Sequence, residues 1–503
     1  MHSVITINII SNFLSRIWLA LISLISIPYI ITHLGANAYA VLSLSLVIVG
    51  YFALLDLGLG RGIVKFIAEY NAIDEKEKIR KLIGTSIVFY GIMGFIGAII
   101  LAALTNLLTT KVLKIPIELQ DTSKIVFYLT SLALLFRIPQ ILFTSISTGY
   151  QKIHFLNIVN VIVSTLKILI TVSLLYLGFF LVSIVIANLC LGIVQLVCLI
   201  WLSKKLLPHK AFYPRFDIHI AKQIFRFSLN AFIADFMGVI IVHLDKFLIG
   251  VFLPIANMAY YTVAFELASR IWEVPTNITS AAYPAFSEAH ANGEKDRMVQ
   301  LYIKISKFIM IGTAYIAIII ILFAKEILTY WINEDFATKG ATTLRIFGVG
   351  VLISSSAWAA LTVANGVGRP DIPAKVHSIM APLNVILCLI LIPRYGINGA
   401  AMAWLLQHML DIFLMIPWVN KSITGIRSWD YFFKCYLKPL GLSLLVGLAV
   451  FIMTKSYITN LITLFVVIGV GGLLYYSVSY FIALNREERS QIKLFLTRRV
   501  ANA

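Results

Sequence analysis

The sequence predicts an all-α polytopic membrane protein with about 14 transmembrane helices, arranged as two parallel six-helix lobes plus two C-terminal helices. Three observations support this fold class: the apolar composition, the placement of positive charge in the loops, and an internal repeat. Of 503 residues, 60% are hydrophobic and 13% are charged, and the mean hydropathy is +0.92. A soluble core of this size would not bury so much apolar surface, so we expect it to lie in lipid.

The predicted spans are apolar runs of roughly twenty residues, which is the length that crosses a bilayer at about 1.5 Å per helical residue. An even number of spans returns the C-terminus to the side on which the chain starts. The runs lie near residues 8–31, 38–60, 84–106, 124–147, 157–177, 179–202, 226–250, 258–282, 304–324, 342–364, 376–392, 397–419, 437–455 and 460–484.

The positive charge lies mainly between these runs. A net charge of +18 would suggest a nucleic-acid partner in a soluble chain, but here it indicates membrane orientation, and we expect no nucleic acid. If the N-terminus is cytoplasmic, the inner connections and the tail carry 28 Lys and Arg, and the outer connections carry seven. This bias predicts a multi-pass protein of the plasma (inner) membrane with both termini cytoplasmic.

An internal repeat organises the runs. LGANAY at 34–39 recurs as LPIANMAY at 253–260, and KFIAEYNAIDEKEK aligns with AFSEAHANGEKDRM at a similar offset of about 220 residues. TGYQK aligns with NGVGR and LYLG with PRYG, again about 218 residues apart. A duplication of six spans inserts both copies the same way up, so we expect two bundles related by an axis along the membrane normal. The predicted parts are an N-terminal lobe at 1–202, a basic cytoplasmic linker at 203–225, a C-terminal lobe at 226–419, and two extra helices with a basic tail at 420–503.

Charged residues inside the spans are the candidate site, because each costs about 2.5 to 3.5 kcal/mol to insert and must face protein or water. Arg137 and Lys167 have no acid at helical spacing within their own spans, so they are the best candidates for binding an anion. Arg16, Lys246 and Arg270 complete the predicted substrate-binding set.

Two members of this set also have structural explanations. Glu266, Arg270 and Glu273 are spaced to neutralise one another on one helical face. Lys246 follows Asp245 near the outer end of its span, where a lysine reaches the interface at little cost.

The candidate ion-coupling residues are three intramembrane acids, Asp56, Asp235 and Asp411. His408 lies three residues before Asp411, so the two side chains can titrate as a couple. Coupling to a proton or sodium gradient and direct use of the membrane potential remain alternatives.

The remaining motifs predict neither catalysis nor a cofactor. The four cysteines are scattered without CxxC spacing, no GxxxxGK[ST] sequence occurs, and no catalytic constellation stands out. We therefore expect no metal, no cofactor and no enzymatic activity. GIVKFIAEY at 62–70 and REERSQIKLFLTRR at 486–499 are predicted to be interfacial helices with Lys and Arg toward anionic lipid.

Four phrases resemble a known family. They are IPYIITHLGANAYAVLSLSLVIVGYFALLDLGLGRGIVKFIAE, HLDKFLIGVFLPIANMAYYTVAFELA, AAYPAFSEA and LTVANGVGRP. Together they are similar to the Wzx-type flippases of O-antigen and other polysaccharide repeat units, in the superfamily shared with multidrug extruders and lipid II flippases. The resemblance implies a cationic cavity between two lobes and export of undecaprenyl-diphosphate-linked oligosaccharide from the inner to the outer leaflet. The implied partners are this lipid-linked oligosaccharide, membrane lipids and a polysaccharide polymerase.

Three other classes are less consistent with the residues. A multidrug cation antiporter of the same superfamily should carry more acids than bases in its lumen. A major-facilitator carrier usually has GxxxDxxGRR after its second span, whereas this chain has LDLGLGRG. A non-transporting scaffold does not explain so many charges within spans.

Overall fold

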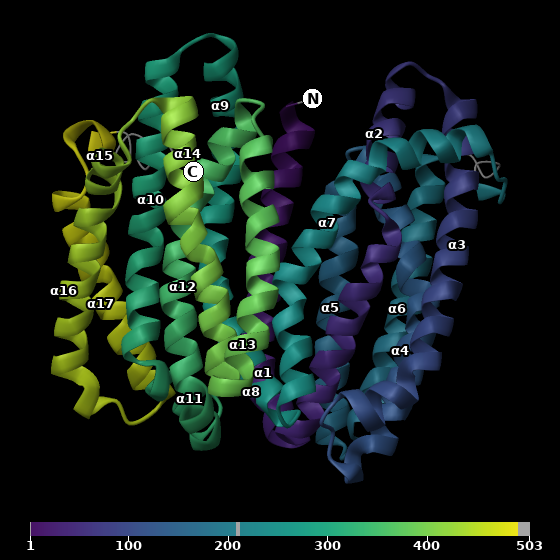
Figure 1. Ribbon diagram of the computed structural model, residues 1–503, viewed down its shortest axis with the longest axis horizontal. Helices are drawn as coiled ribbons and strands as arrows, with labels where there is room; N and C mark the ends of the chain where they lie inside the picture. Colours follow the sequence, from purple (N-terminus) through teal and green to yellow (C-terminus); the bar gives the residue numbers. More distant parts are fainter. Residues whose placement is uncertain (1, 208–211, 491–503) are drawn as a thin grey trace. The chain divides into compact units, whose positions relative to one another are not determined.

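The computed structural model describes residues 2–207 and 212–490, and within them the chain is almost entirely helical and contains no strand (Figure 1). The predicted all-α class is therefore confirmed. The principal helices are α1 (His2–Phe52), α2 (Leu59–Ala72), α3 (Lys76–Leu107), α4 (Ile117–Gly149), α5 (Ile153–Tyr176), α6 (Leu181–Leu206), α7 (Ile218–Phe252), α8 (Ala256–Ser269), α9 (Glu273–Ala291), α10 (Lys295–Leu322), α11 (Ala324–Trp331), α12 (Glu334–Gly366), α13 (Asp371–Leu410), α14 (Ile416–Val419), α15 (Ser428–Phe432), α16 (Lys438–Thr454) and α17 (Leu461–Ile482).

The number of spans agrees with the prediction of about 14. Within the described residues, 10 helical segments are long and apolar enough to cross a membrane. Two of them, Ser11–Asp56 and Asp371–Thr424, have 46 and 54 residues, about twice the length that a bilayer requires. Each bends sharply at a glycine with positive φ, Gly35 in α1 and Gly396 in α13, so each provides two spans. Helix α7 and the segment α8 to α9 correspond to the other two predicted spans.

The predicted eighth span is not one continuous helix. A short 3₁₀ segment, η4 (Arg270–Trp272), separates α8 from α9. Pro275 explains the break, because it has no N–H to donate to the carbonyl of residue 271 and its ring clashes with that turn.

The chain divides into two compact units, Met1–Thr262 and Val263–Ala503. Helix α7 packs on α1, α2 and α3 and so belongs to the first unit, although the repeat makes it the first span of the second half. The boundary between the units therefore lies after the predicted linker at 203–225. The predicted lobes follow the sequence repeat, and their bounds differ from those of the two compact units. Asp217 caps α7 by accepting hydrogen bonds from the backbone of Ile220 and His219, which hold the pKa of Asp217 below its usual value.

Within the first unit, α4 packs on α3 and α6, and α1 packs on α5. Polar contacts hold α1 on α5: the side chain of Asn157 donates to Asn12 at 2.6 Å, and the indole N–H of Trp18 donates to Thr165 at 2.8 Å. Helix α2 lies at one end of the unit and packs on α4 and α7.

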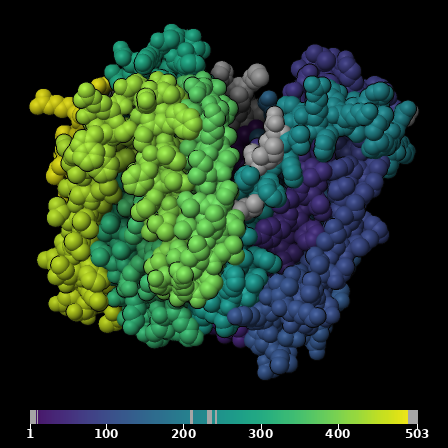
Figure 2. Space-filling model, in the orientation of Figure 1, coloured from purple at the N-terminus to yellow at the C-terminus, as the bar shows by residue number. Residues whose placement is uncertain are grey.

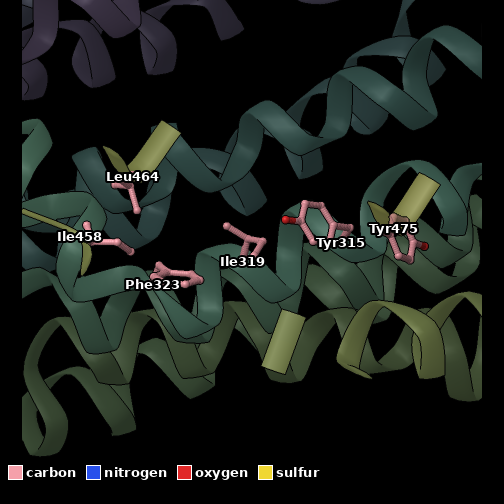
Figure 3. Close-up of a cluster of buried hydrophobic side chains, with 6 residues drawn as sticks. All are labelled: Tyr315, Ile319, Phe323, Ile458, Leu464 and Tyr475. Carbon is pink, nitrogen blue, oxygen red and sulfur yellow. The ribbon is translucent and has the colours of Figure 1, made fainter. Parts of the chain in front are cut away.

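Within the second unit, α10 packs on α9, α12 and α16. The two C-terminal helices α16 and α17 form one flank of this unit, drawn in yellow in Figure 2. Buried side chains dock them on α10, with Ile319 of α10 and Phe323, the residue that follows this helix, meeting residues around α17 (Figure 3). The extra pair of spans is thus part of the core of this unit. The full cluster is Tyr315, Ile319, Phe323, Ile458, Leu464 and Tyr475.

The repeat is visible in the local geometry of three pairs of turns, with one member of each pair in each half. Asp74 and Gly293, 219 residues apart, both have positive φ, and in each turn the next residue's N–H donates to the carbonyl five residues back at 2.9 Å. Gln151 and Gly368 form a second such pair, and the N–H after each donates to the carbonyl five residues back at 2.9 and 2.8 Å. Gly178 and Gly396 form the third pair of positive-φ residues. The two halves therefore share turn conformations at the predicted offset.

Candidate anion-binding site

The structure brings together two of the predicted binding residues, Arg137 on α4 and Lys167 on α5. The half-buried side chain of Lys167 lies within electrostatic range of the positive charge of Arg137, whose own side chain is exposed. Among the described residues, no carboxylate lies within ion-pair distance of either side chain. Two like charges near each other are unfavourable, and the cost grows where the dielectric constant is low. A multiply charged anion between the two side chains would offset this cost.

An amide network positions the guanidinium of Arg137. Its Nη1 donates to Oε1 of Gln140, one helical turn along α4, at 2.8 Å. The Nε2 of the same Gln140 donates to the carbonyl of Gly192 on α6 at 2.8 Å. Helix α6 also carries Gln195, which donates to Asn160 of α5 at 3.0 Å. The two helices that carry Arg137 and Lys167, α4 and α5, are thus each joined to α6 by a buried glutamine.

Sequence reasoning missed these amides, because it considered only charged side chains. Gln140 and Gln195 are both buried, at 4% and 8% exposure, within otherwise apolar spans. An uncharged amide in such a span also needs a hydrogen-bond partner, so it could have been found as a signal for helix contacts.

Arg16 lies on α1 in the same unit and is exposed. The surrounding segment of α1 and the facing part of α5 form an apolar groove of about 650 Å³. The groove residues are Ser11, Leu14, Ser15, Ile17, Trp18, Leu21, Ile158, Val161 and Ile162.

Lys246 does not reach the outer surface, which corrects the prediction from its position near the end of the span. Its exposure is 7%, and that of Asp245 is 2%. The hydroxyl of Tyr261 donates to Asp245, and so does the backbone N–H of Lys246, at 2.7 Å in the latter case. The hydropathy pattern predicts how deep Lys246 lies along the span, but it does not predict which face of α7 other helices cover. The structure shows that the face with Lys246 and Asp245 is buried.

Arg270 belongs to the second unit, where it forms the predicted pair with Glu266. The two side chains meet at 3.1 Å and are 30% and 38% exposed. Arg270 also begins the 3₁₀ segment η4, so this ion pair spans the point at which α8 ends.

The ion-coupling candidates have different surroundings. Asp56 accepts hydrogen bonds from the backbone N–H of Gly60 at 3.0 Å and from the hydroxyl of Tyr90, which are the contacts of a residue that fixes the start of α2. Asp411 is buried at 4% exposure and contacts His408 at 2.9 Å. Asp235 lies in α7, and its side chain is outside the described part of the structure.

The Asp411 and His408 couple adjoins an aromatic cluster. The imidazole of His408 lies 4.5 Å from the ring of Trp404, measured between centroids. Trp272 follows at 5.6 Å from Trp404, and its indole N–H donates to Ser354 at 2.9 Å. Asp411 also begins a π-helical turn, a feature often found at functional sites in helices.

Comparison with known proteins identifies the family. The chain matches the family described as polysaccharide biosynthesis protein over residues 5–290, more than half of its length. It therefore belongs to that family. The MatE family also matches, over residues 231–390.

Two curated relatives cover most of the chain. A putative O-antigen transporter of Shigella flexneri is 21% identical over 415 residues, which cover 81% of this chain and 95% of the relative. A putative O-antigen transporter of Salmonella typhimurium is 24% identical over 416 residues, covering 80% and 89%.

Two solved structures share the fold. The lipid II flippase MurJ in an inward closed conformation aligns with a TM-score of 0.72 at 14% identity, covering 94% of this chain and 98% of that one. An inward-facing multidrug resistance transporter of the MATE family aligns with a TM-score of 0.69 at 15% identity, covering 82% and 98%. At these identities the likeness concerns the fold, and it agrees with a multi-pass membrane protein.

Proposed function

We propose that this protein flips undecaprenyl-diphosphate-linked oligosaccharide repeat units from the inner to the outer leaflet of the plasma membrane during polysaccharide biosynthesis. The observation that carries the proposal is that two cations within predicted spans, Arg137 and Lys167, lie within electrostatic range of each other in one helical unit, where among the described residues no carboxylate pairs with either. Membership of the polysaccharide biosynthesis family and the similarity to putative O-antigen transporters support the same substrate class.

In this proposal a diphosphate relieves the repulsion between the two cations. Lys167 supplies a point charge, and Arg137 supplies a planar fork that binds two phosphate oxygens at once. Gln140 orients the fork by accepting from one of its nitrogens. The prenyl chain stays outside this polar region, and the apolar groove between α1 and α5 is a suitable place for it.

The membrane potential assists outward movement of the diphosphate. Moving a negative charge out of a cell whose interior is negative is favoured by about 2.3 kcal/mol per charge per 100 mV. A proton gradient can contribute through Asp411 and His408, since they form a hydrogen-bonded couple of titratable groups. Asp56 and Asp235 remain the other coupling candidates, and a polymerase that consumes the exported unit is the expected protein partner.

The test is a flipping assay with purified protein in vesicles that contain a fluorescent lipid-linked oligosaccharide. Loss of a hydrogen bond to a charged group costs about 1.5 to 3 kcal/mol, so Arg137→Gln and Lys167→Gln should each slow flipping by about tenfold or more. Arg345→Gln is the matched control, because Arg345 also lies within a span but donates to the carbonyl of Ile321. Equal rates in the wild type and in the Arg137 and Lys167 variants would reject the proposed site.

Export of organic cations is the alternative function, favoured by the MatE match and by the buried carboxylate of Asp411. The same vesicles loaded with a cationic dye distinguish the two functions. Dye efflux that Asp411→Asn abolishes, together with no oligosaccharide flipping, would replace the proposal.

A further inference from the structure

A basic groove lies on the first unit, lined by residues of α2 and of the start of α7. It has a volume of about 720 Å³ and lies at the end of the unit that carries the predicted cytoplasmic loops. It is separate from Arg137 and Lys167, neither of which lines it. The residues that line it are Arg61, Lys65, Phe66, Glu69, Gln223, Arg226 and Phe227.

The groove carries an excess of positive charge. Arg61 and Lys65 lie one turn apart on α2, and Arg226 faces the groove from α7. Glu69 is its one acid, and it meets Lys65 only at 4.0 Å. Three bases against one acid favour an anionic ligand.

Aromatic rings accompany these charges. The ammonium of Lys65 lies 4.3 Å from the ring centroid of Phe227 and 4.9 Å from that of Phe66. On the other side of Arg226, a mainly apolar cavity of about 360 Å³ begins, lined by Phe225, Phe216 and Ile218 among others. Arg226 lines both spaces. The combined site therefore has a cationic part and an apolar part next to each other.

The site is held in shape by close packing of α2 on α7. A Cβ at Gly62 would lie 2.7 Å from the hydroxyl of Ser228, so only glycine permits this approach. The hydroxyl of Tyr70 donates to Gln223 at 3.2 Å and joins the helices a second time. A preformed helix contact thus fixes the backbone positions that carry the three exposed basic side chains.

We propose that this site binds an anionic membrane phospholipid, with its phosphate at Arg61, Lys65 and Arg226 and its acyl chains in the neighbouring apolar cavity. A soluble phosphate would use the cations but would leave the apolar cavity unused. A lipid at the membrane interface fills both parts. The inference does not depend on the transported substrate.

Native mass spectrometry of the full-length protein in detergent tests the proposal, with phosphatidylglycerol and phosphatidylcholine as probes. Each basic side chain near an anionic lipid contributes about 1 kcal/mol, or a factor of about five. Arg226→Gln should therefore weaken retention of phosphatidylglycerol about fivefold, and the triple change of Arg61, Lys65 and Arg226 to Gln by about a hundredfold. The wild type should retain phosphatidylglycerol in preference to phosphatidylcholine.

The control removes the same number of charges from the start of α3, with Lys76, Lys78 and Arg80 changed to Gln, and should retain the lipid. Thermal unfolding checks that each variant is folded, and the single Arg226→Gln change serves if the triple variant is not. Equal retention by wild type and Arg226→Gln would overturn the proposal. Binding of inorganic phosphate as tightly as phosphatidylglycerol would assign a soluble anion instead, and retention of undecaprenyl diphosphate alone would assign a substrate-loading site.

Discussion

At the scale of the residue, the intramembrane charges divide by what surrounds them. Glu266 and Arg270 neutralise each other, and Asp56 accepts from the start of α2. Arg137 and Lys167 instead are two positive charges within electrostatic range of each other, an arrangement that does not stabilise a fold by itself. This contrast is why the site hypothesis centres on them.

Arg137 should be only partly replaceable by lysine. Arg137→Lys keeps the positive charge but loses the planar fork and the geometry of the bond to Gln140. We expect Arg137→Lys to export less polysaccharide than wild type, but with a smaller loss than the roughly tenfold or greater loss expected of Arg137→Gln. Export is measured in cells and normalised to the amount of protein in the membrane. Identical export by the lysine and glutamine variants would show that the charge at this position is not used.

The pair Glu266 and Arg270 should behave as a structural unit. Arg270→Gln leaves a carboxylate in the membrane interior and should lower stability by about 1 kcal/mol, a modest value because both side chains are partly exposed. Adding Glu266→Gln should restore most of that loss. Thermal unfolding of the two single variants and the double variant gives the coupling energy. Additive losses in the double variant would mean that the pair contributes nothing.

Among the helices, α2 shows that an amphipathic pattern predicts which face of a helix is exposed but not how closely the other face packs. The sequence predicted an interfacial helix, and its charged face is indeed exposed. The other face is fully packed, since Ile63, Phe66 and Ile67 are buried. The glycines of LGLGRG account for this close packing, which a hydropathy pattern does not report.

Gly62→Ala should destabilise the protein by forcing α2 away from α7. The new methyl group would meet the Ser228 hydroxyl at 2.7 Å and Ile224 at 3.1 Å, and such overpacking costs about 1 to 3 kcal/mol. Ser228→Ala removes the nearer atom and should recover part of the loss. Unfolding temperatures of the single and double variants measure both effects. Gly91→Ala is the control, because no atom lies within 4 Å of the Cβ position there.

The turn after α4 offers a stabilising change. Gln151 has φ of 58°, a left-handed conformation that costs a residue with a side chain about 1 kcal/mol, and its repeat counterpart is Gly368. Gln151→Gly should therefore raise the unfolding temperature, and Gly368→Gln should lower it. A Cβ at Gly368 meets nothing within 4 Å, so the penalty there comes from the backbone. A lower unfolding temperature for Gln151→Gly would contradict this account.

At the scale of the whole molecule, the features that follow chain order were predictable. Hydropathy gave the spans, and the offset of the repeat gave paired turns such as Asp74 and Gly293. The break at Arg270 was not foreseen, because a proline can kink a helix or interrupt it, depending on its neighbours. The burial of Lys246 and the amide contacts of Gln140 depend on which helix faces which, and composition does not carry that information.

The orientation of the whole chain in the membrane is the remaining prediction. With 28 Lys and Arg on one set of connections and seven on the other, positive charge should retain the first set in the cytoplasm. A fluorescent protein fused after Glu75 or at the C-terminus should therefore fold and fluoresce, whereas alkaline phosphatase fused at these points should be inactive. Fusion after Asn333, in a connection of the opposite set, is the control and should give the reverse pattern. Active phosphatase at Glu75 or at the C-terminus would invert the assigned topology, and the α2 and α7 site would then face the other leaflet.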